Sequence, residues 1–181
     1  MARPNVLLLS LLFFIATVSV VALADTRCVY TIRVQTGKRD SAGTDSTISV
    51  SLLDKFGKQF EISDLEKWGG FVGPKHDYFE IGDLDVFSGD GPCLPSPVCL
   101  LRLSSDGKGA APGWYVDYVD VTVRFKSGGK TTNHLFNVYQ WLADEPGYRL
   151  HAVRDNCGIS REKTVGPVVW SDIPKRLSSI V

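Results

Sequence analysis

Two aspartates, Asp40 and Asp45, lie within a polar, glycine-containing stretch at residues 37–46 (GKRDSAGTDS). Carboxylates and backbone carbonyls are the hard oxygen ligands that Ca²⁺ prefers, usually about six to eight at a time. Gly43 has no side chain and would let a carbonyl oxygen come close to such an ion. Aspartate and glycine are also common turn formers, and Asp45 could simply accept hydrogen bonds from backbone amides of its own turn. The stretch therefore has two interpretations, a calcium loop or a turn between two strands.

Other side chains that support catalysis do not form a recognisable motif. The three histidines, His76, His134 and His151, are far apart in the sequence, and none belongs to an HExxH motif. The sequence also lacks the GxSxG, P-loop and GxGxxG patterns. Ser88, in FSGDG, has the setting of a turn former rather than of a nucleophile. The sequence therefore predicts a protein that has no catalytic residues and is not an enzyme.

The first 24 residues have the features of a secretory signal peptide. One basic residue, Arg3, precedes an apolar run, and Ala22-Leu23-Ala24 fits the pattern of a signal-peptidase site. We expect cleavage before Asp25; an uncleaved signal anchor is the alternative. The remaining 157 residues suit one domain and carry 19 basic and 20 acidic residues, a net charge of −1. This charge balance excludes a nucleic-acid partner.

The four cysteines follow this expected signal peptide, which favours disulfides over metal ligands. Cys93 and Cys99 enclose LPSPV, and the two prolines of this short loop favour a local bridge. A second bridge between Cys28 and Cys157 would then tie the ends of the domain together. Four cysteines allow three pairings, of which we predict Cys28–Cys157 and Cys93–Cys99.

The elements that must position these residues are strands. Segments with the alternating pattern of a half-buried strand are separated by turn signals such as SSDGKG, KSGGK and DEPG. A change of phase in WYVDYVDVTVRF predicts a β-bulge near Tyr118. Ser63 and Glu66 fit a capping box that starts a short helix, which Gly69-Gly70 would end. The predicted strands are 28–36, 47–53, 58–62, 77–87, 98–103, 114–125, 134–141 and 148–154.

Three motifs in this order resemble a known domain. YTIRVQTG followed by AGTDSTISVSLLDKFG is similar to the opening of a PLAT (lipoxygenase-homology, LH2) domain. FSGDGPCLPSPVCLLRLSSDGKGAAPGWYVDYVDVTV resembles its second half, and HLFNVYQWL its closing strand. With its expected signal peptide and four cysteines, the chain most resembles the plant secretory proteins that consist of a single PLAT domain and are linked to stress or embryo development.

The resemblance implies an all-β fold, an eight-stranded antiparallel β-sandwich of two four-stranded sheets. It divides the chain into a signal peptide (1–24), a PLAT domain (25–157) and a tail of unassigned structure (158–181). It also implies a module that binds a lipid or membrane surface, and the alternative is a module that binds another protein. We expect a monomer.

In calcium-dependent PLAT domains, loops at one end of the sandwich supply the ligands. The resemblance therefore implies that Asp106, in SSDGKG, joins Asp40, Gly43 and Asp45 in one calcium site, and Asp64 is a weaker candidate. No other cofactor is implied. The turn-former interpretation stays open for each aspartate.

Two aromatic residues, Trp68 and Phe71, lie in the glycine-rich stretch EKWGGFVGPKH. On an exposed loop they would suit the interface of a membrane. Alternatively, Trp68 folds back and covers the open end of the sandwich. The sequence has no C-terminal retention signal such as KDEL, so we expect export to the extracellular space or apoplast, with the endoplasmic reticulum as the alternative.

Overall fold

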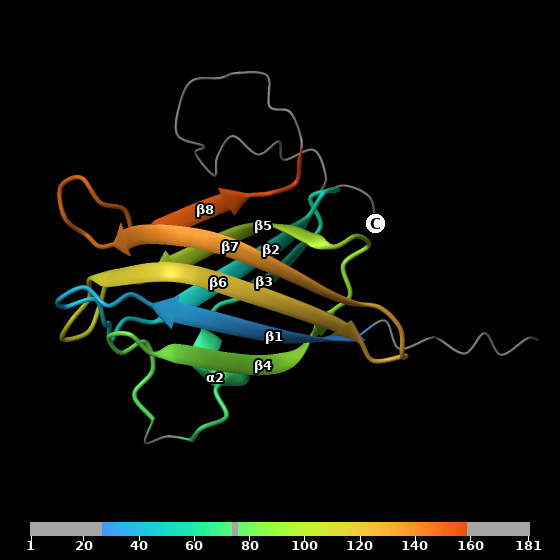
Figure 1. Cartoon of the computed structure of the whole chain (residues 1–181), viewed down its shortest axis with the longest axis horizontal. Helices are drawn as coiled ribbons and strands as arrows, with labels where there is room; N and C mark the ends of the chain where they lie inside the picture. Colours follow the sequence, from blue (N-terminus) through green and yellow to red (C-terminus); the bar gives the residue numbers. More distant parts are fainter. Residues whose placement is uncertain (1–26, 74–75, 159–181) are drawn as a thin grey trace, which may run out of the picture.

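Eight strands form two four-stranded sheets packed face to face in the computed structural model, which describes residues 27–73 and 76–158 (Figure 1). Every pair of neighbouring strands is antiparallel; the strand orders are β4-β1-β6-β7 and β3-β2-β5-β8. The predicted eight-stranded sandwich is confirmed. The expected signal peptide and most of the expected tail lie outside the described residues. The elements are β1 (Arg27–Thr36), β2 (Ile48–Asp54), β3 (Gln59–Ile62), α2 (Leu65–Gly69), β4 (Leu84–Pro92), β5 (Val98–Ser105), β6 (Trp114–Phe125), β7 (Thr131–Leu142) and β8 (His151–Asp155).

The core lies between the sheets because alternate residues of each strand face inward. In β1, every second residue from Cys28 to Thr36 is buried and the residues between them are half-exposed. Trp114, at the start of β6, is fully buried, and its indole Nε1 donates to Thr36 Oγ1 at 3.0 Å. This bond satisfies the one polar atom of the Trp114 side chain. The largest fully buried side chains are Trp114, Tyr30, Phe79, Phe87, Phe136, Ile32, Ile48, Leu52, Leu65, Leu101, Leu103 and Leu142.

The predicted bulge in β6 is confirmed. The register of β6 shifts between Val116 and Tyr118 against β7, and at the same place against β1. The residues before the shift and those after it therefore use opposite phases to face the core, as the sequence pattern indicated. This strand can be buried along both halves because the bulge absorbs the change of phase.

One predicted strand is displaced. We predicted a strand over 77–87, but residues 77–83 form a loop and β4 runs from Leu84 to Pro92. Phe79 has a positive φ of 64°, which a strand does not accommodate. Its backbone N–H donates to the buried carboxylate of Asp85 at 2.7 Å. Tyr78 and Phe79 are buried and cover the core from a loop. Their apolar side chains gave this loop a sequence pattern like that of a strand.

The short helix α2 forms where it was predicted, with a different cap. Asp64, not Ser63, is the N-cap, and its Oδ1 accepts a hydrogen bond from Lys67 N at 3.0 Å. Gly70 is the C-cap, as the glycine pair indicated.

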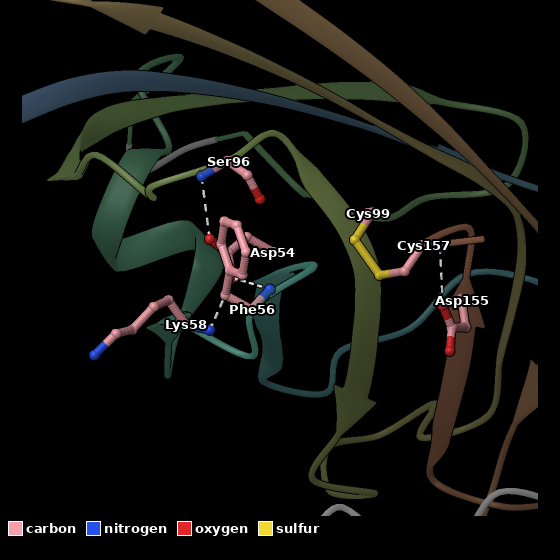
Figure 2. Close-up of a disulfide and its surroundings, with 7 residues drawn as sticks. All are labelled: Asp54, Phe56, Lys58, Ser96, Cys99, Asp155 and Cys157. Atoms are coloured by element: carbon pink, nitrogen blue, oxygen red, sulfur yellow. Dashed lines mark hydrogen bonds between the residues drawn. A yellow bond between two sulfur atoms is a disulfide. The ribbon is translucent and has the colours of Figure 1, made fainter. Parts of the chain in front are cut away.

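The predicted disulfide pairing is wrong. The bonds join Cys28 to Cys93 and Cys99 to Cys157, and the second is drawn in Figure 2. Antiparallel pairing explains both: the start of β1 lies against the end of β4, and β5 pairs with β8 so that Asn156 N donates to Cys99 O at 2.8 Å. The chain between Cys93 and Cys99 crosses from one sheet to the other, which separates the two cysteines that we predicted to pair.

Candidate functional site

Three connections meet at one end of the sandwich, beyond the last residue of β1 (left in Figure 1). We call this end, residues 37–47, 76–83 and 106–113, the loop end. Backbone hydrogen bonds join the first connection to both others: Thr44 N donates to Phe79 O at 3.3 Å, and Asp45 N to Ala111 O at 3.2 Å. The topology therefore brings the two turns that were predicted to share a cation site to the same place.

Asp45 holds the first connection to the third. Its Oδ2 accepts a hydrogen bond from Ala111 N at 2.9 Å. A Cβ atom at Gly109 would lie 2.7 Å from the Asp45 Cβ, and Gly109 has a φ of +103°. Glycine is therefore needed there for the two connections to approach. Asp45 accepts from a backbone amide, as the turn interpretation proposed, but the amide belongs to the third connection and not to its own turn; Asp45 is exposed to solvent.

Asp106 makes a similar clamp on the other side of the first connection. Its Oδ1 accepts from Thr47 N and from Lys108 N, both at 3.1 Å, and its own N–H donates to Thr47 O. One carboxylate thus fixes the start of β2 and the turn that follows β5. Such bonds to backbone amides are charge-assisted and stronger than neutral ones.

Gly43 lies against Glu80, which was not among the predicted site residues. A Cβ atom at Gly43 would be 3.2 Å from Phe79 O and 3.4 Å from Glu80 Cα, so the absent side chain lets the second connection approach. Partial desolvation, followed by the negative charges of Asp77 and Asp45, raises the pKa of Glu80. Only the fold places Glu80 beside residues 43–45.

The other two predicted ligands lie apart from this group. Asp40 is exposed at the tip of the first connection. Asp64 caps α2 and pairs with Lys67 Nζ at 2.6 Å; despite some desolvation, these hydrogen bonds lower the pKa of Asp64. Within residues 27–73 and 76–158, no three side chains of His, Cys, Asp or Glu form a cluster close enough to hold a metal ion. Any cation here would rely on backbone oxygens and water as well.

A buried carboxylate, that of Asp85, anchors the second connection by binding His76 and Phe79. Asp85 is 3% exposed, and its Oδ1 lies 3.0 Å from His76 Nε2 while its Oδ2 accepts from Phe79 N. The His76 ring meets Tyr78 edge-on at 4.4 Å between centroids. The carboxylate of Asp85, the second residue of β4, therefore holds both ends of the segment from His76 to Phe79.

Trp68 does not lie on a loop tip. It belongs to α2, its ring packs edge-on against Phe60 at 6.1 Å, and its Nε1 donates to Asp90 O at 3.3 Å. Gly89 makes room for this ring, because a Cβ atom there would lie 2.7 Å from it. Trp68 therefore takes the alternative position, folded back on the sandwich. Phe71, by contrast, is 66% exposed, and its neighbour Val72 is 59% exposed.

The exposed pair is joined to the loop end. Val72 N donates to the Tyr78 hydroxyl at 3.3 Å, and Tyr78 is packed in the core next to Phe79 and Phe87. The two projecting apolar side chains are thus connected through Tyr78 to the loop end, which carries the acids. No helix in the described part of the chain is long and apolar enough to span a bilayer.

Comparison with known sequences gives one family. A profile of the PLAT/LH2 domain matches residues 30–153. Two proteins of Arabidopsis thaliana, PLAT domain-containing proteins 2 and 1, are 53% and 48% identical, with 100% of both chains aligned in each case. Lipoxygenase homology domain-containing protein 1 of Mus musculus is 27% identical over 66% of this chain and 5% of that protein.

Comparison with solved structures gives the same fold. A LOX variant aligns with a TM-score of 0.51 and 21% identity, covering 72% of this chain and 16% of that chain. A calcium-dependent 11R-lipoxygenase aligns with a TM-score of 0.50 and 23% identity, covering 71% of this chain and 17% of that chain. The sandwich therefore corresponds to a small part of these larger proteins, and the likeness concerns the fold.

Proposed function

The chain belongs to the PLAT/LH2 domain family, and from this membership we propose that it is a non-catalytic module that binds membrane surfaces through its loop end, assisted by calcium. PLAT domains are known in interactions with membranes and with other proteins. The observation that carries the proposal is the exposed pair Phe71-Val72, which is joined through Tyr78 to the connection that also carries Glu80. The two disulfides fit an oxidising compartment of the secretory pathway.

The apolar pair supplies the hydrophobic part of the binding. Two adjacent large apolar side chains that project from one connection can enter the interfacial region of a bilayer without any change in the sandwich. Trp68 supports the base of this connection rather than entering the membrane. Each side chain that leaves water contributes about 1.5–3 kcal/mol at full burial, so the pair suits reversible attachment.

Calcium supplies the electrostatic part. The acids of the loop end repel anionic lipids; desolvation, and after it the negative charges of Asp77 and Asp45, raises the pKa of Glu80 among them. An ion bound by Asp45, Glu80 and the Gly43 carbonyl would cancel this repulsion and bridge to lipid phosphates. Asp40, at the tip of the first connection, and Asp106, on the third, complete the proposed set. Exposed ligands on loops suit a weak site, with a dissociation constant of roughly 10⁻⁴–10⁻³ M.

Vesicle sedimentation tests the proposal. Vesicles of phosphatidylcholine and phosphatidylserine should carry the protein into the pellet with millimolar calcium and release it with a chelator. Phe71→Ser combined with Val72→Ser should weaken the calcium-dependent binding about tenfold or more. Leu135→Ser is the matched control, because Leu135 is equally apolar and 50% exposed on β7. Binding that survives in the double variant, or that ignores calcium, would contradict the proposal.

Calorimetry addresses the ion separately. Glu80→Gln should reduce the heat of calcium binding and leave the turns intact, since the backbone clamps at this end use Asp45 and Asp106. Glu61→Gln, on the exposed face of β3, is the control. If the wild type shows neither calcium heat nor a calcium-dependent rise in melting temperature, these residues are turn formers alone.

A second candidate function has its own observation. Tyr139, in the bulged part of the edge strand β7, is 63% exposed and has a positive φ of 44°, and Leu135 is exposed on the same strand. A bulky residue in the left-handed region is unusual and often marks an interaction site. A protein partner that used this edge would leave the chain in the supernatant in the vesicle assay.

A further inference from the structure

A cavity of about 240 Å³ opens at the opposite end of the sandwich from the loop end. It lies between the inward faces of β1 and β6 and the connection from β4 to β5. The register places Tyr30 across from Val123 and Cys28 across from Phe125, and these four residues form one wall. The opposing wall is apolar as well, made by Leu94, Pro95, Pro97 and Val98.

The wall formed by residues 94–98 is held in place at several points. Cys93 is bonded to Cys28 on one side, and Cys99 to Cys157 on the other. In the middle, Ser96 N donates to Asp54 Oδ2 at 3.1 Å (Figure 2). Asp54 is buried, and its other oxygen accepts from Phe56 N and Lys58 N. The cavity is therefore preformed and does not depend on the movement of a loop.

Two polar groups of this cavity lack partners. The Ser96 Oγ is buried and has no hydrogen-bond partner among the described residues. A buried hydroxyl without a partner costs free energy, which a ligand with an acceptor would recover once the Ser96 side chain rotates its Oγ toward the cavity. Lys130, exposed in the turn between β6 and β7, lines the same cavity and forms none of the salt bridges seen in residues 27–73 and 76–158. Its neighbour Lys126 instead pairs with Asp90.

We propose that this cavity binds a small amphipathic carboxylate, with its apolar chain between the sheets and its carboxylate against Ser96 and Lys130. The lining selects an apolar chain, the unpartnered hydroxyl selects an acceptor, and the lysine selects negative charge. The volume is slightly below the roughly 300–1,000 Å³ of sites for drug-sized ligands, which indicates a chain of roughly eight carbons. The site is independent of the membrane surface proposed above, because the two lie at opposite ends of β1.

Titration of the full chain with octanoate, followed by amide NMR, tests this inference. Saturable shifts are expected at residues that line the cavity, with an affinity of order millimolar for so small a ligand. Lys130→Met should weaken octanoate binding about two- to fivefold, because the lysine is exposed, and leave binding of neutral 1-octanol unchanged. Lys126→Met is the matched control, being a lysine of the same turn that does not line the cavity, and should change neither ligand.

A variant that fills the cavity separates internal binding from surface adsorption. Val123→Phe should abolish binding of both octanoate and 1-octanol, with the melting temperature showing that the chain still folds. Ser96→Ala should weaken octanoate a few-fold. The inference is overturned if octanoate binds Val123→Phe as tightly as the wild type, if Lys130→Met and Lys126→Met have equal effects, or if the shifts map to Phe71 and Val72.

Discussion

The two ends of the sandwich are organised by different bonds. At the loop end, carboxylates hold long connections by accepting hydrogen bonds from backbone amides: Asp45, Asp106 and Asp85 each do so. At the opposite end, which we call the cystine end (Cys28, residues 92–99 and Cys157), one carboxylate, Asp54, also accepts from a backbone amide, but two disulfides hold the connection from β4 to β5 on either side of it. The loop end should therefore respond to ions and protons, and the cystine end to reductants.

Removing a disulfide should have the largest effect on stability. The bonds span 65 and 58 residues, so in the chain-entropy model each lowers the entropy of the unfolded chain by an amount worth about 4 kcal/mol. Replacing Cys99 and Cys157 together by alanine should lower the free energy of unfolding by that order, as measured in urea. The variant with Cys28 and Cys93 replaced should lose a similar amount. A loss below about 1 kcal/mol in both variants would show that the cystine end does not depend on its cross-links.

At the loop end, Asp85→Ala should have the largest effect. It leaves the buried Phe79 N–H without its acceptor and removes the partner of His76, at a cost of about 2–3 kcal/mol. Hydrogen exchange should accelerate at residues 76–80 and remain unchanged near Cys99. Asp40→Ala, at an exposed carboxylate, should change stability by less than about 0.5 kcal/mol. If protection is lost equally at both ends, they do not open independently.

A smaller effect is expected for Asp106→Ala, which removes two hydrogen bonds at an exposed clamp. Because water can replace the lost acceptor, the expected loss is about 1 kcal/mol. The amides of Thr47 and Lys108 should exchange faster, since both donate to Oδ1. Asp106→Asn keeps one acceptor oxygen and should recover about half of the loss. No change in either amide would mean that the clamp is not formed in solution.

The smallest effect is expected from His134, on β7 between the two ends. Burial, opposed by the charge of Asp120, lowers the pKa of His134 below its ordinary 6.5. The folded state therefore favours the neutral ring, and the resulting stability is present above pH 6.5 and lost as the pH falls through the lower folded pKa. The loss should be a few tenths of a kcal/mol because the ring is partly exposed. His134→Gln should remove this pH dependence in urea titrations at pH 5 and 7; the same slope in the variant would assign it to other groups.

Much of the fold follows from short-range pattern. The strands β1 and β6 alternate over many residues, and even the bulge at Tyr118 leaves a change of phase in the sequence. The displaced strand β4 shows the limit of such reasoning. Tyr78 and Phe79 lie in a loop and are buried by a tertiary contact. A local sequence pattern cannot distinguish a buried loop of this kind from a strand.

The site depends on contacts between distant segments. Asp45 and Asp106 were assigned to one end by their family resemblance, whereas Glu80 is 35 residues from Asp45 and joins it only through the folded connection. The pairing of Cys28 with Cys93 likewise follows from the register of β1 and β4, which the spacing of the cysteines does not encode. The sequence could not decide between the two positions of Trp68, because the space at Gly89 that receives its ring becomes available only once β4 is formed.

The cysteine pairing also decides how the molecule is connected. Residues 28–93 close one covalent ring and residues 99–157 close a second, and the five residues 94–98 are the only link between them within residues 28–157. Each sheet nevertheless takes two strands from each ring. A nick in the link would leave two separate cyclic pieces with interleaved strands, whereas a nick inside either ring would leave one covalent molecule. In covalent terms, the domain consists of two macrocycles joined by a five-residue linker, and the strands of the two macrocycles pair with one another as those of two subunits would.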